Sequence, residues 1–330
     1  MRPFAYARPD HVEDAVRLAS EPATRYLGGG TNLVDLMKLG VERPERLVDI
    51  TRLPYEFVTL EADGALRIGA NVRNSELAAD PVVRRRFPVL SEALLAGASG
   101  QLRNVATVGG NLLQRTRCSY FQDITKPCNK RSPGSGCPAR EGEHHNLAIL
   151  GASEQCIATH PSDMAVALAA LDATVHVQTL DGPTEIALAD FYVGPGDDPS
   201  RETTLPPGAL ITSVDLPPLP VNARSRYRKV RERASYAFAI ASVAAAVELA
   251  DGVVRDVRLA FGAVAPMPWR ARVAEGELRG GRLDETTVRA AVRAELAQAR
   301  PRRDNAYKLE LVTSIAVRTL LDLVAPQELS

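Results

Sequence analysis

All four cysteines of this 330-residue chain lie in one short segment, at Cys118, Cys128, Cys137 and Cys156. Two disulfides would add little stability to a chain long enough to bury a large core. Four neighbouring thiolates instead suit a single metal site. The gaps of nine, eight and eighteen residues contain no Cys-x2-Cys pair, the spacing common in zinc ribbons. Spacing alone therefore leaves three alternatives: an iron–sulfur cluster, a zinc ion, or disulfides and free thiols.

The composition excludes several classes of protein. Forty Lys and Arg balance forty Asp and Glu, so the net charge is zero and no basic tract marks a nucleic-acid surface. No apolar run reaches the roughly 18–20 residues of a membrane-spanning helix. The first residues, Met1 to Tyr6, lack the apolar core of a signal peptide, so we expect no export signal on this chain.

A run of three glycines is the first candidate binding loop. The expected strand Arg25–Leu27 leads into Gly28-Gly29-Gly30-Thr31-Asn32, and a helix is expected over 33–39. Backbone without Cβ atoms can approach phosphates, and successive N–H groups can donate to their oxygens. The loop therefore suits a diphosphate, although a plain flexible turn is the alternative.

A second loop of similar chemistry follows at Thr107-Val108-Gly109-Gly110-Asn111. It again offers a hydroxyl, two glycines and an amide. Two such loops from separate segments could hold one dinucleotide between two lobes, which favours a binding function over two unrelated turns.

The rest of the chain alternates between strand and helix patterns. Asp10 and Glu13 form a possible capping box, and a helical pattern over 74–98 is interrupted by two prolines. Residues 114–159 are polar and irregular, and residues 217–222 read as a linker. A long hairpin with strands over 236–250 and 253–264 turns at Asp251-Gly252, and two helices over 286–299 and 306–324 close the chain.

The two glycine loops resemble a known family. Leu27-Gly28-Gly29-Gly30-Thr31-Asn32-Leu33 and the longer run from Arg103 to Leu112 are similar to the FAD loops of molybdenum-hydroxylase flavoprotein subunits. The resemblance covers essentially the whole chain. It implies an α+β fold: a two-lobed, PCMH-type FAD-binding domain, with lobes over 1–55 and 56–220, and a C-terminal α/β domain of antiparallel sheet and helices over 224–330.

The resemblance also implies the residues that hold the cofactor. In the family, a Ser-Asp pair and a strand pass near the flavin, and a lysine reaches it; a cation there would stabilise an anionic reduced flavin. Asp163 is alternatively the N-cap of a helix, and Lys229 a surface lysine. The expected FAD contacts are Leu27, Gly28, Gly29, Gly30, Thr31, Asn32, Leu33, Thr107, Gly109, Gly110, Asn111, Ser162, Asp163, Ile211 and Lys229.

The cysteine segment is an insertion relative to xanthine dehydrogenase, in which the second loop leads almost directly to the Ser-Asp pair. It resembles the insertion of two subfamilies whose FAD subunit holds a 4Fe–4S cluster: periplasmic-type aldehyde oxidoreductases and 4-hydroxybenzoyl-CoA reductases. The flanking residues, 114–121 and 128–131, are more similar to the aldehyde enzymes. The resemblance implies that Cys118, Cys128, Cys137 and Cys156 ligate one such cluster. His144 and His145 could also be ligands, but with four cysteines present we interpret them as solvated loop residues.

Taken together, the resemblance implies an electron-transfer subunit with no catalytic residue of its own. The substrate, most simply an aldehyde, would be oxidised on a large molybdenum-cofactor subunit. Electrons would pass through a small subunit with two 2Fe–2S clusters to FAD and then to an acceptor: oxygen, quinone, NAD or a protein. The assembly would be a heterotrimer or its dimer, without nucleic acid or membrane insertion, cytoplasmic, or periplasmic if a partner carries a twin-arginine signal. A xanthine dehydrogenase or 4-hydroxybenzoyl-CoA reductase type complex, a self-sufficient FAD oxidoreductase and a zinc scaffold are the alternatives.

Overall fold

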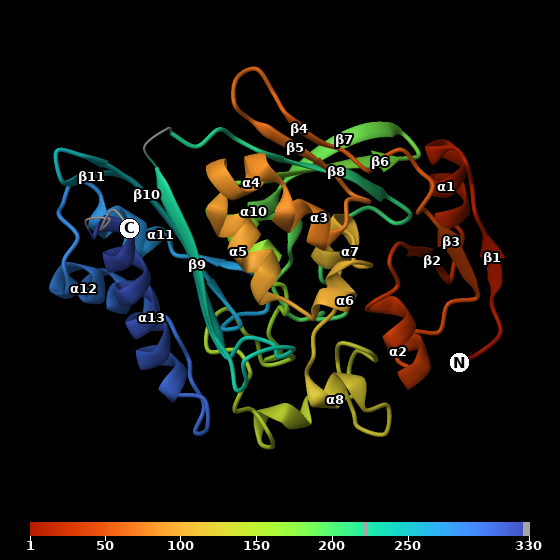
Figure 1. Cartoon of the computed structure of the whole chain (residues 1–330). Helices are drawn as coiled ribbons and strands as arrows, with labels where there is room; N and C mark the ends of the chain where they lie inside the picture. The colour runs from red at the N-terminus through yellow and green to blue at the C-terminus, as the bar shows by residue number, and fades with distance from the viewer. Residues whose placement is uncertain (221–222, 326–330) are drawn as a thin grey trace.

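The computed structural model describes residues 1–220 and 223–325, which form three β-sheets with helices packed between and around them (Figure 1). The N-terminal lobe lies at the right of Figure 1, the five-stranded sheet at the upper centre, and the C-terminal helices at the left. The cysteine segment, with helix α8 (Ser119–Gln122), lies at the bottom of the view. The expected α+β architecture is confirmed.

The first lobe is a small parallel sheet. Its strands, in the spatial order β1-β3-β2, are Ala5–Ala7, Arg46–Asp49 and Thr24–Leu27. Parallel neighbours need crossover connections, and these are helices α1 (Val12–Ala19) and α2 (Leu33–Leu39). The expected capping box is wrong, because α1 begins after His11, whose side chain makes no capping bond.

The second lobe is an antiparallel sheet in the order β4-β5-β8-β6-β7. These strands are Val58–Leu60, Leu66–Gly69, Leu210–Leu216, Thr174–Thr179 and Gly182–Ala187. The accompanying helices are α3 (Asn74–Ala79), α4 (Pro81–Arg86), α5 (Pro88–Ala96), α6 (Gly100–Arg103), α7 (Val108–Leu112), α9 (Asp163–Ala170) and α10 (Leu188–Phe191). The prolines divide the helical stretch as expected, since Pro81 and Pro88 each stand in the first turn of a new helix.

The C-terminal part is a second antiparallel sheet, in the order β12-β11-β10-β9. Its strands are Trp269–Arg270, Val253–Gly262, Ala241–Ala250 and Arg224–Val230. Its helices are α11 (Arg272–Leu278), α12 (Glu285–Leu296) and α13 (Tyr307–Val324). Strand β10 is buried on both faces: Ala244 packs in the core shared with α5 and α9, whereas Val243 and Ala245 pack in the core shared with α12 and α13. This explains its unbroken apolar sequence.

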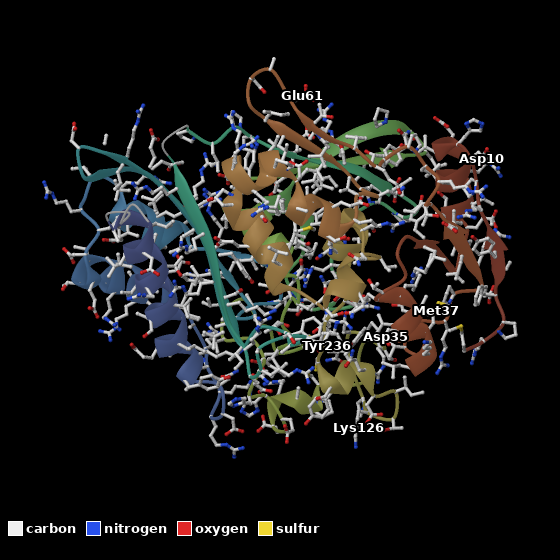
Figure 2. The ribbon with its side chains drawn as sticks, in the orientation of Figure 1. Asp10, Asp35, Met37, Glu61, Lys126 and Tyr236 are labelled. Atoms are coloured by element: carbon white, nitrogen blue, oxygen red, sulfur yellow. The ribbon has the colours of Figure 1, made fainter. Side chains whose placement is uncertain are left out.

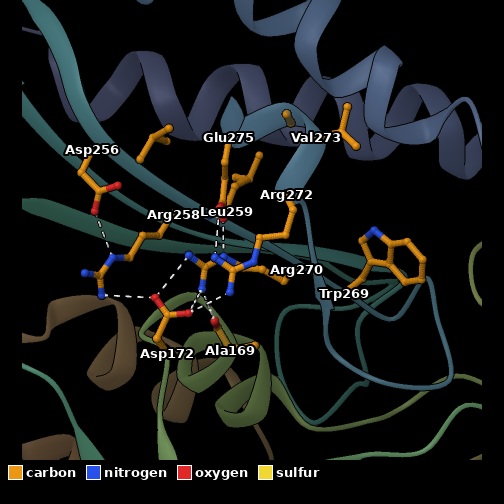
Figure 3. Close-up of polar contacts among 12 residues, drawn as sticks. Ala169, Asp172, Asp256, Arg258, Leu259, Trp269, Arg270, Arg272, Val273 and Glu275 are labelled. Atoms are coloured by element: carbon orange, nitrogen blue, oxygen red, sulfur yellow. Dashed lines mark hydrogen bonds and ion pairs between the residues drawn. The ribbon is translucent and has the colours of Figure 1, made fainter. Parts of the chain in front are cut away.

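A polar cluster joins α9 to the C-terminal sheet (Figure 3). Asp172, just beyond α9, accepts a hydrogen bond from Arg270 at 2.6 Å and lies 3.6 Å from the guanidinium of Arg258. Arg270 also pairs with Glu275, which is fully buried in α11. The charges compensate one another across the contact, so α9 is held against the sheet by ion pairs as well as by apolar packing.

No described helix is both long and apolar enough to cross a membrane. Of the linker expected over 217–222, residues 221–222 lie outside the described residues, as do residues 326–330 of the C-terminal domain. The strand expected from Tyr236 begins instead at Ala241, and residues 231–240 form an irregular connection between β9 and β10.

Lys308, near the start of α13, is fully buried without a carboxylate partner. Its ammonium donates to the carbonyls of Asn146, at 2.9 Å, and Ala263, at 2.8 Å. Burial lowers the pKa of Lys308 to about 7. Between pH 7 and about 10.4 the unfolded chain therefore holds a proton that the folded chain has lost, and stability rises with pH.

We expect Lys308→Met to remove this dependence. The measured quantity is the difference in the free energy of unfolding between the wild-type chain and the variant. This difference should rise between pH 7.5 and 9.5 by up to about 1.4 kcal/mol per pH unit, and it should be constant below pH 6.5. Urea unfolding at a series of pH values measures the difference. A difference that stays constant with pH would contradict the lowered pKa of Lys308.

Candidate functional site

A cavity of about 710 Å³ lies where the two N-terminal lobes, the cysteine segment and the C-terminal sheet meet. Its wall includes Asp35 of α2 and Tyr236 of the β9–β10 connection, which Figure 2 labels near the lower centre of the molecule. A second cavity of about 300 Å³ continues along the first glycine loop and shares Thr31, Asn32 and Gly110 with the first. Together they have the volume of a site for a large organic cofactor.

The first glycine loop has the properties expected of a phosphate site. The backbone N–H groups from Gly28 to Asn32 donate no hydrogen bond to any other part of the described chain. The side-chain amide nitrogen of Asn32 is buried and also lacks a partner, whereas its Oδ1 accepts from the backbone N–H of Arg115 at 2.9 Å. Consecutive free donors on a cavity wall form an anion-binding nest, and a diphosphate would satisfy them.

Glycine is required in this loop for two reasons. A Cβ at Gly29 would lie 2.0 Å from the carbonyl oxygen of Val105, so the first loop touches the segment that leads into the second. Gly30 has a φ of +72°, in the left-handed region that side chains disfavour. Gly29 therefore holds the two loops together in addition to exposing backbone to the cavity.

The second loop differs from the first, because most of its N–H groups are already used. Val108 donates to the carbonyl of Val72, Gly109 donates to that of Ala70, and Gly110 donates to the Thr107 hydroxyl oxygen, which caps α7. The Thr107 hydroxyl proton remains available. The nest is thus formed by the first loop, and the second contributes the facing wall.

Asp163 and Lys229 meet at the wall of the larger cavity, and Ser162 lies next to Asp163 behind that wall. Ser162, rather than Asp163, is the N-cap of α9, accepting from the N–H of Ala165 at 2.9 Å, so the N-cap alternative for Asp163 is wrong. Asp163 instead pairs with the Lys229 ammonium at 2.8 Å and accepts a hydrogen bond from Tyr227. The Lys229 side chain is only 3% exposed, so it is not a surface lysine.

Removing one member of this buried pair should destabilise the fold. We expect Lys229→Met to reduce the free energy of unfolding of the FAD-free chain by about 3–5 kcal/mol, because the Asp163 carboxylate loses its counter-ion. The double variant Lys229→Met/Asp163→Asn should regain part of that loss. Urea denaturation measures both, and a Lys229→Met chain as stable as the wild type would show that the pair is not formed.

The structure brings the expected cofactor contacts together with two exceptions. Thirteen of the fifteen line one of the two cavities, including Ile211 of β8, whereas Leu27 and Ser162 lie behind the walls. Sequence reasoning missed other wall residues, all outside the glycine motifs: Asn74, Asn146, Glu232, Arg233 and Phe238. The buried Oδ1 of Asn74 has no hydrogen-bond partner among the described residues, which makes it a candidate polar contact for a ligand.

The four cysteines line one small cavity within the insertion. The pKa of Cys118 is raised to about 11, mainly by burial and to a smaller extent by the neighbouring Cys156 and Cys128. Within residues 1–220 and 223–325, no three His, Cys, Asp or Glu side chains converge closely enough to hold a single metal ion. The structure therefore places the four cysteines around one space without showing a metal site there.

The two histidines of the insertion contact the C-terminal part instead of the cysteines. His144 is buried and its Nε2 accepts from the N–H of Asp304 at 3.2 Å, so its expected role as a solvated loop residue is wrong. The exposed ring of His145 stacks on Tyr307, with ring centroids 4.6 Å apart. Neither lines the cysteine cavity.

Comparison with known proteins decides the family. Residues 2–219 match the FAD-binding domain in molybdopterin dehydrogenase, and residues 225–323 match the carbon monoxide dehydrogenase flavoprotein C-terminal domain. The chain belongs to the flavoprotein family of the molybdopterin dehydrogenases. It is an oxidoreductase chain with an FAD-binding domain, as the sequence resemblance implies.

Relatives within this flavoprotein family align over nearly the whole chain. The aldehyde oxidoreductase FAD-binding subunit PaoB of Escherichia coli is 50% identical over 327 residues, 98% of each chain. The glyceraldehyde dehydrogenase medium chain of Sulfolobus acidocaldarius is 26% identical, covering 97% of this chain and 98% of that one. The fold is similar to carbon monoxide dehydrogenase of Hydrogenophaga pseudoflava, with a TM-score of 0.77 at 24% identity over 98% of this chain and 97% of that one.

Proposed function

We propose that this chain is the FAD- and 4Fe–4S-containing electron-transfer subunit of a heteromeric molybdenum hydroxylase of the aldehyde oxidoreductase type. The observation that carries the proposal is 50% identity along the full length to an aldehyde oxidoreductase FAD-binding subunit. The relatives at 26% identity include a glyceraldehyde dehydrogenase medium chain, which agrees with an aldehyde substrate, and a putative xanthine dehydrogenase FAD-binding subunit, which does not. The aldehyde assignment therefore rests mainly on the more similar protein.

The residues around the two cavities fit FAD. The free N–H groups of Gly28 to Asn32 would hold the diphosphate, and Asn32 Nδ2 would donate to it. Lys229, fixed by Asp163, would present a positive charge to the isoalloxazine side of the larger cavity. When bound, FAD supplies a redox centre that can link one-electron iron–sulfur clusters to a two-electron acceptor.

Two observations support a 4Fe–4S cluster at the cysteines. All four sulfur-bearing side chains border one cavity, and together they supply the complete ligand set of such a cluster. In addition, buried thiols with raised pKa values need a cationic partner to ionise, and iron would provide one.

The proposed assembly places substrate oxidation on other chains. A large molybdenum-cofactor subunit would oxidise the aldehyde, and a small subunit with two 2Fe–2S clusters would carry electrons to this chain. The complex would be a heterotrimer or its dimer, and it would be periplasmic if a partner carries a twin-arginine signal, or otherwise cytoplasmic. The medium chains of carbon monoxide and glyceraldehyde dehydrogenases, which are relatives of this chain, support such a division of labour.

The test is to assay the chain alone and within its purified complex. The isolated, molybdenum-free chain should oxidise aromatic or aliphatic aldehydes at less than about 1% of the rate of the complex, because the catalytic centre is on the partner. Adding the partner subunits should restore turnover. Robust aldehyde oxidation by the isolated chain would favour a self-sufficient FAD oxidoreductase instead.

A further inference from the structure

A partly buried network of charges connects the first glycine loop to the cysteine segment. It begins at Asn32, whose Oδ1 accepts from the backbone N–H of Arg115 at 2.9 Å. The Arg115 guanidinium donates to the carboxylates of Glu42 and Glu202, the latter at 2.6 Å. Its Cζ atom lies 4.7 Å from the centre of the Phe121 ring. Arg115 is therefore fixed on three sides while its backbone holds the nest residue Asn32.

The second carboxylate oxygen of Glu202 pairs with a lysine of the cysteine segment. Oε1 pairs with the Lys130 ammonium at 2.9 Å, and Lys130, two residues after Cys128, also donates to the carbonyl of Pro199 at 3.0 Å. The Lys130 side chain is 8% exposed and borders the cysteine cavity. Lys130 therefore belongs both to the wall of the cysteine cavity and to the charge network.

One carboxylate thus joins two cations that belong to different sites. Burial alone would raise the pKa of Glu202, but Arg115 and Lys130 outweigh it and keep the pKa below its usual value. The four groups, Glu42, Arg115, Glu202 and Lys130, have no net charge, which makes their burial tolerable only as a complete set. Two other cations of the insertion are used locally: Arg140 pairs with Glu154, and Arg131 donates to nearby carbonyls.

We infer that Glu202 is a positioning residue that couples the FAD site to the cysteine site, so that filling either one favours filling the other. The inference rests on the proposed function, because it requires both an FAD and a metal cluster in this chain. An ordered cysteine segment holds Lys130 in place, Lys130 and Glu202 orient Arg115, and Arg115 fixes Asn32 with its free donor toward the diphosphate. By linkage, the effect on the two affinities must be reciprocal.

The experiment measures the FAD dissociation constant of the full-length chain with its cluster intact and after removal of iron by a chelator and oxidant. In the wild type, we expect FAD to bind about tenfold more tightly to the cluster-containing form. In Glu202→Gln, the ratio of the FAD dissociation constant without the cluster to that with the cluster should fall to about one. Lys130→Met, which keeps the Glu202–Arg115 contact, should also lower the ratio, so the test does not depend on one variant.

Glu154→Gln is the matched control, because Glu154 pairs with Arg140 in the same segment and its side chain is 75% exposed. It should keep the wild-type ratio. A wild-type ratio of one, or a Glu202→Gln ratio equal to that of the wild type, would overturn the coupling while leaving the proposed function intact. A wild-type chain that binds FAD but no iron would overturn both.

Discussion

Replacing Cys156 with serine is expected to reduce the iron content of the anaerobically purified chain from about four atoms to less than one. Cys156 is 6% exposed and borders the same cavity as the other three cysteines, so no water-accessible substitute ligand is at hand. A serine hydroxyl is a poor ligand for iron at neutral pH, and the broad visible absorption of the cluster should disappear with the metal.

The rest of the chain should survive this substitution. The insertion has a small apolar core of its own, in which Phe121 and Ile157 pack with the cysteines against Leu36 of α2. FAD should therefore still bind, though more weakly. Ser132→Ala, which alters an exposed side chain of the same segment, is the control and should keep all of the iron. Full iron content in Cys156→Ser would show that this cysteine is not a ligand.

Replacing Asn32 with aspartate is expected to raise the FAD dissociation constant about 100-fold, a loss of about 2.7 kcal/mol. The change is almost isosteric. Aspartate keeps the oxygen that accepts from the N–H of Arg115, but it puts a negative charge in place of the buried, unpartnered Nδ2 of a residue that lines the cavity. A hydrogen bond to a charged group is worth about 1.5–3 kcal/mol, and repulsion from the diphosphate adds to its loss.

Titration of the FAD-free chain with FAD, followed by flavin fluorescence, measures this effect. Gln101→Glu is the control, because it adds the same charge at an exposed position of α6 outside both cavities. It should bind FAD as the wild type does. Equal FAD affinity of Asn32→Asp and the wild type would show that the diphosphate does not bind at the first glycine loop.

The parts of the site that the sequence predicts are those encoded by local rules. The nest of Gly28 to Asn32 follows from a local rule, because glycines between a strand and a helix leave successive backbone N–H groups unobstructed. The breaks at Pro81 and Pro88 were predictable because proline cannot continue a helix. The cysteines were grouped correctly as the border of one cavity because they are close in sequence.

Contacts that depend on tertiary structure were not predictable in this way. Glu202 is 87 residues from Arg115, and nothing in the sequence around it marks a site. The second glycine loop looked equivalent to the first, but its N–H groups bond to Val72 and Ala70, which come from a different part of the chain. Phe238 was assigned to a strand because of its apolar neighbours, yet it borders the cavity from an irregular segment.

The most direct test of the account is the cofactor content of the wild-type chain, purified without oxygen together with its partner subunits and then separated from them. We expect about one FAD and about four irons per chain, with a flavin spectrum on a broad iron–sulfur absorption. One equivalent of zinc without iron, or a chain without flavin, would contradict the assignment of this protein as an FAD- and 4Fe–4S-containing subunit.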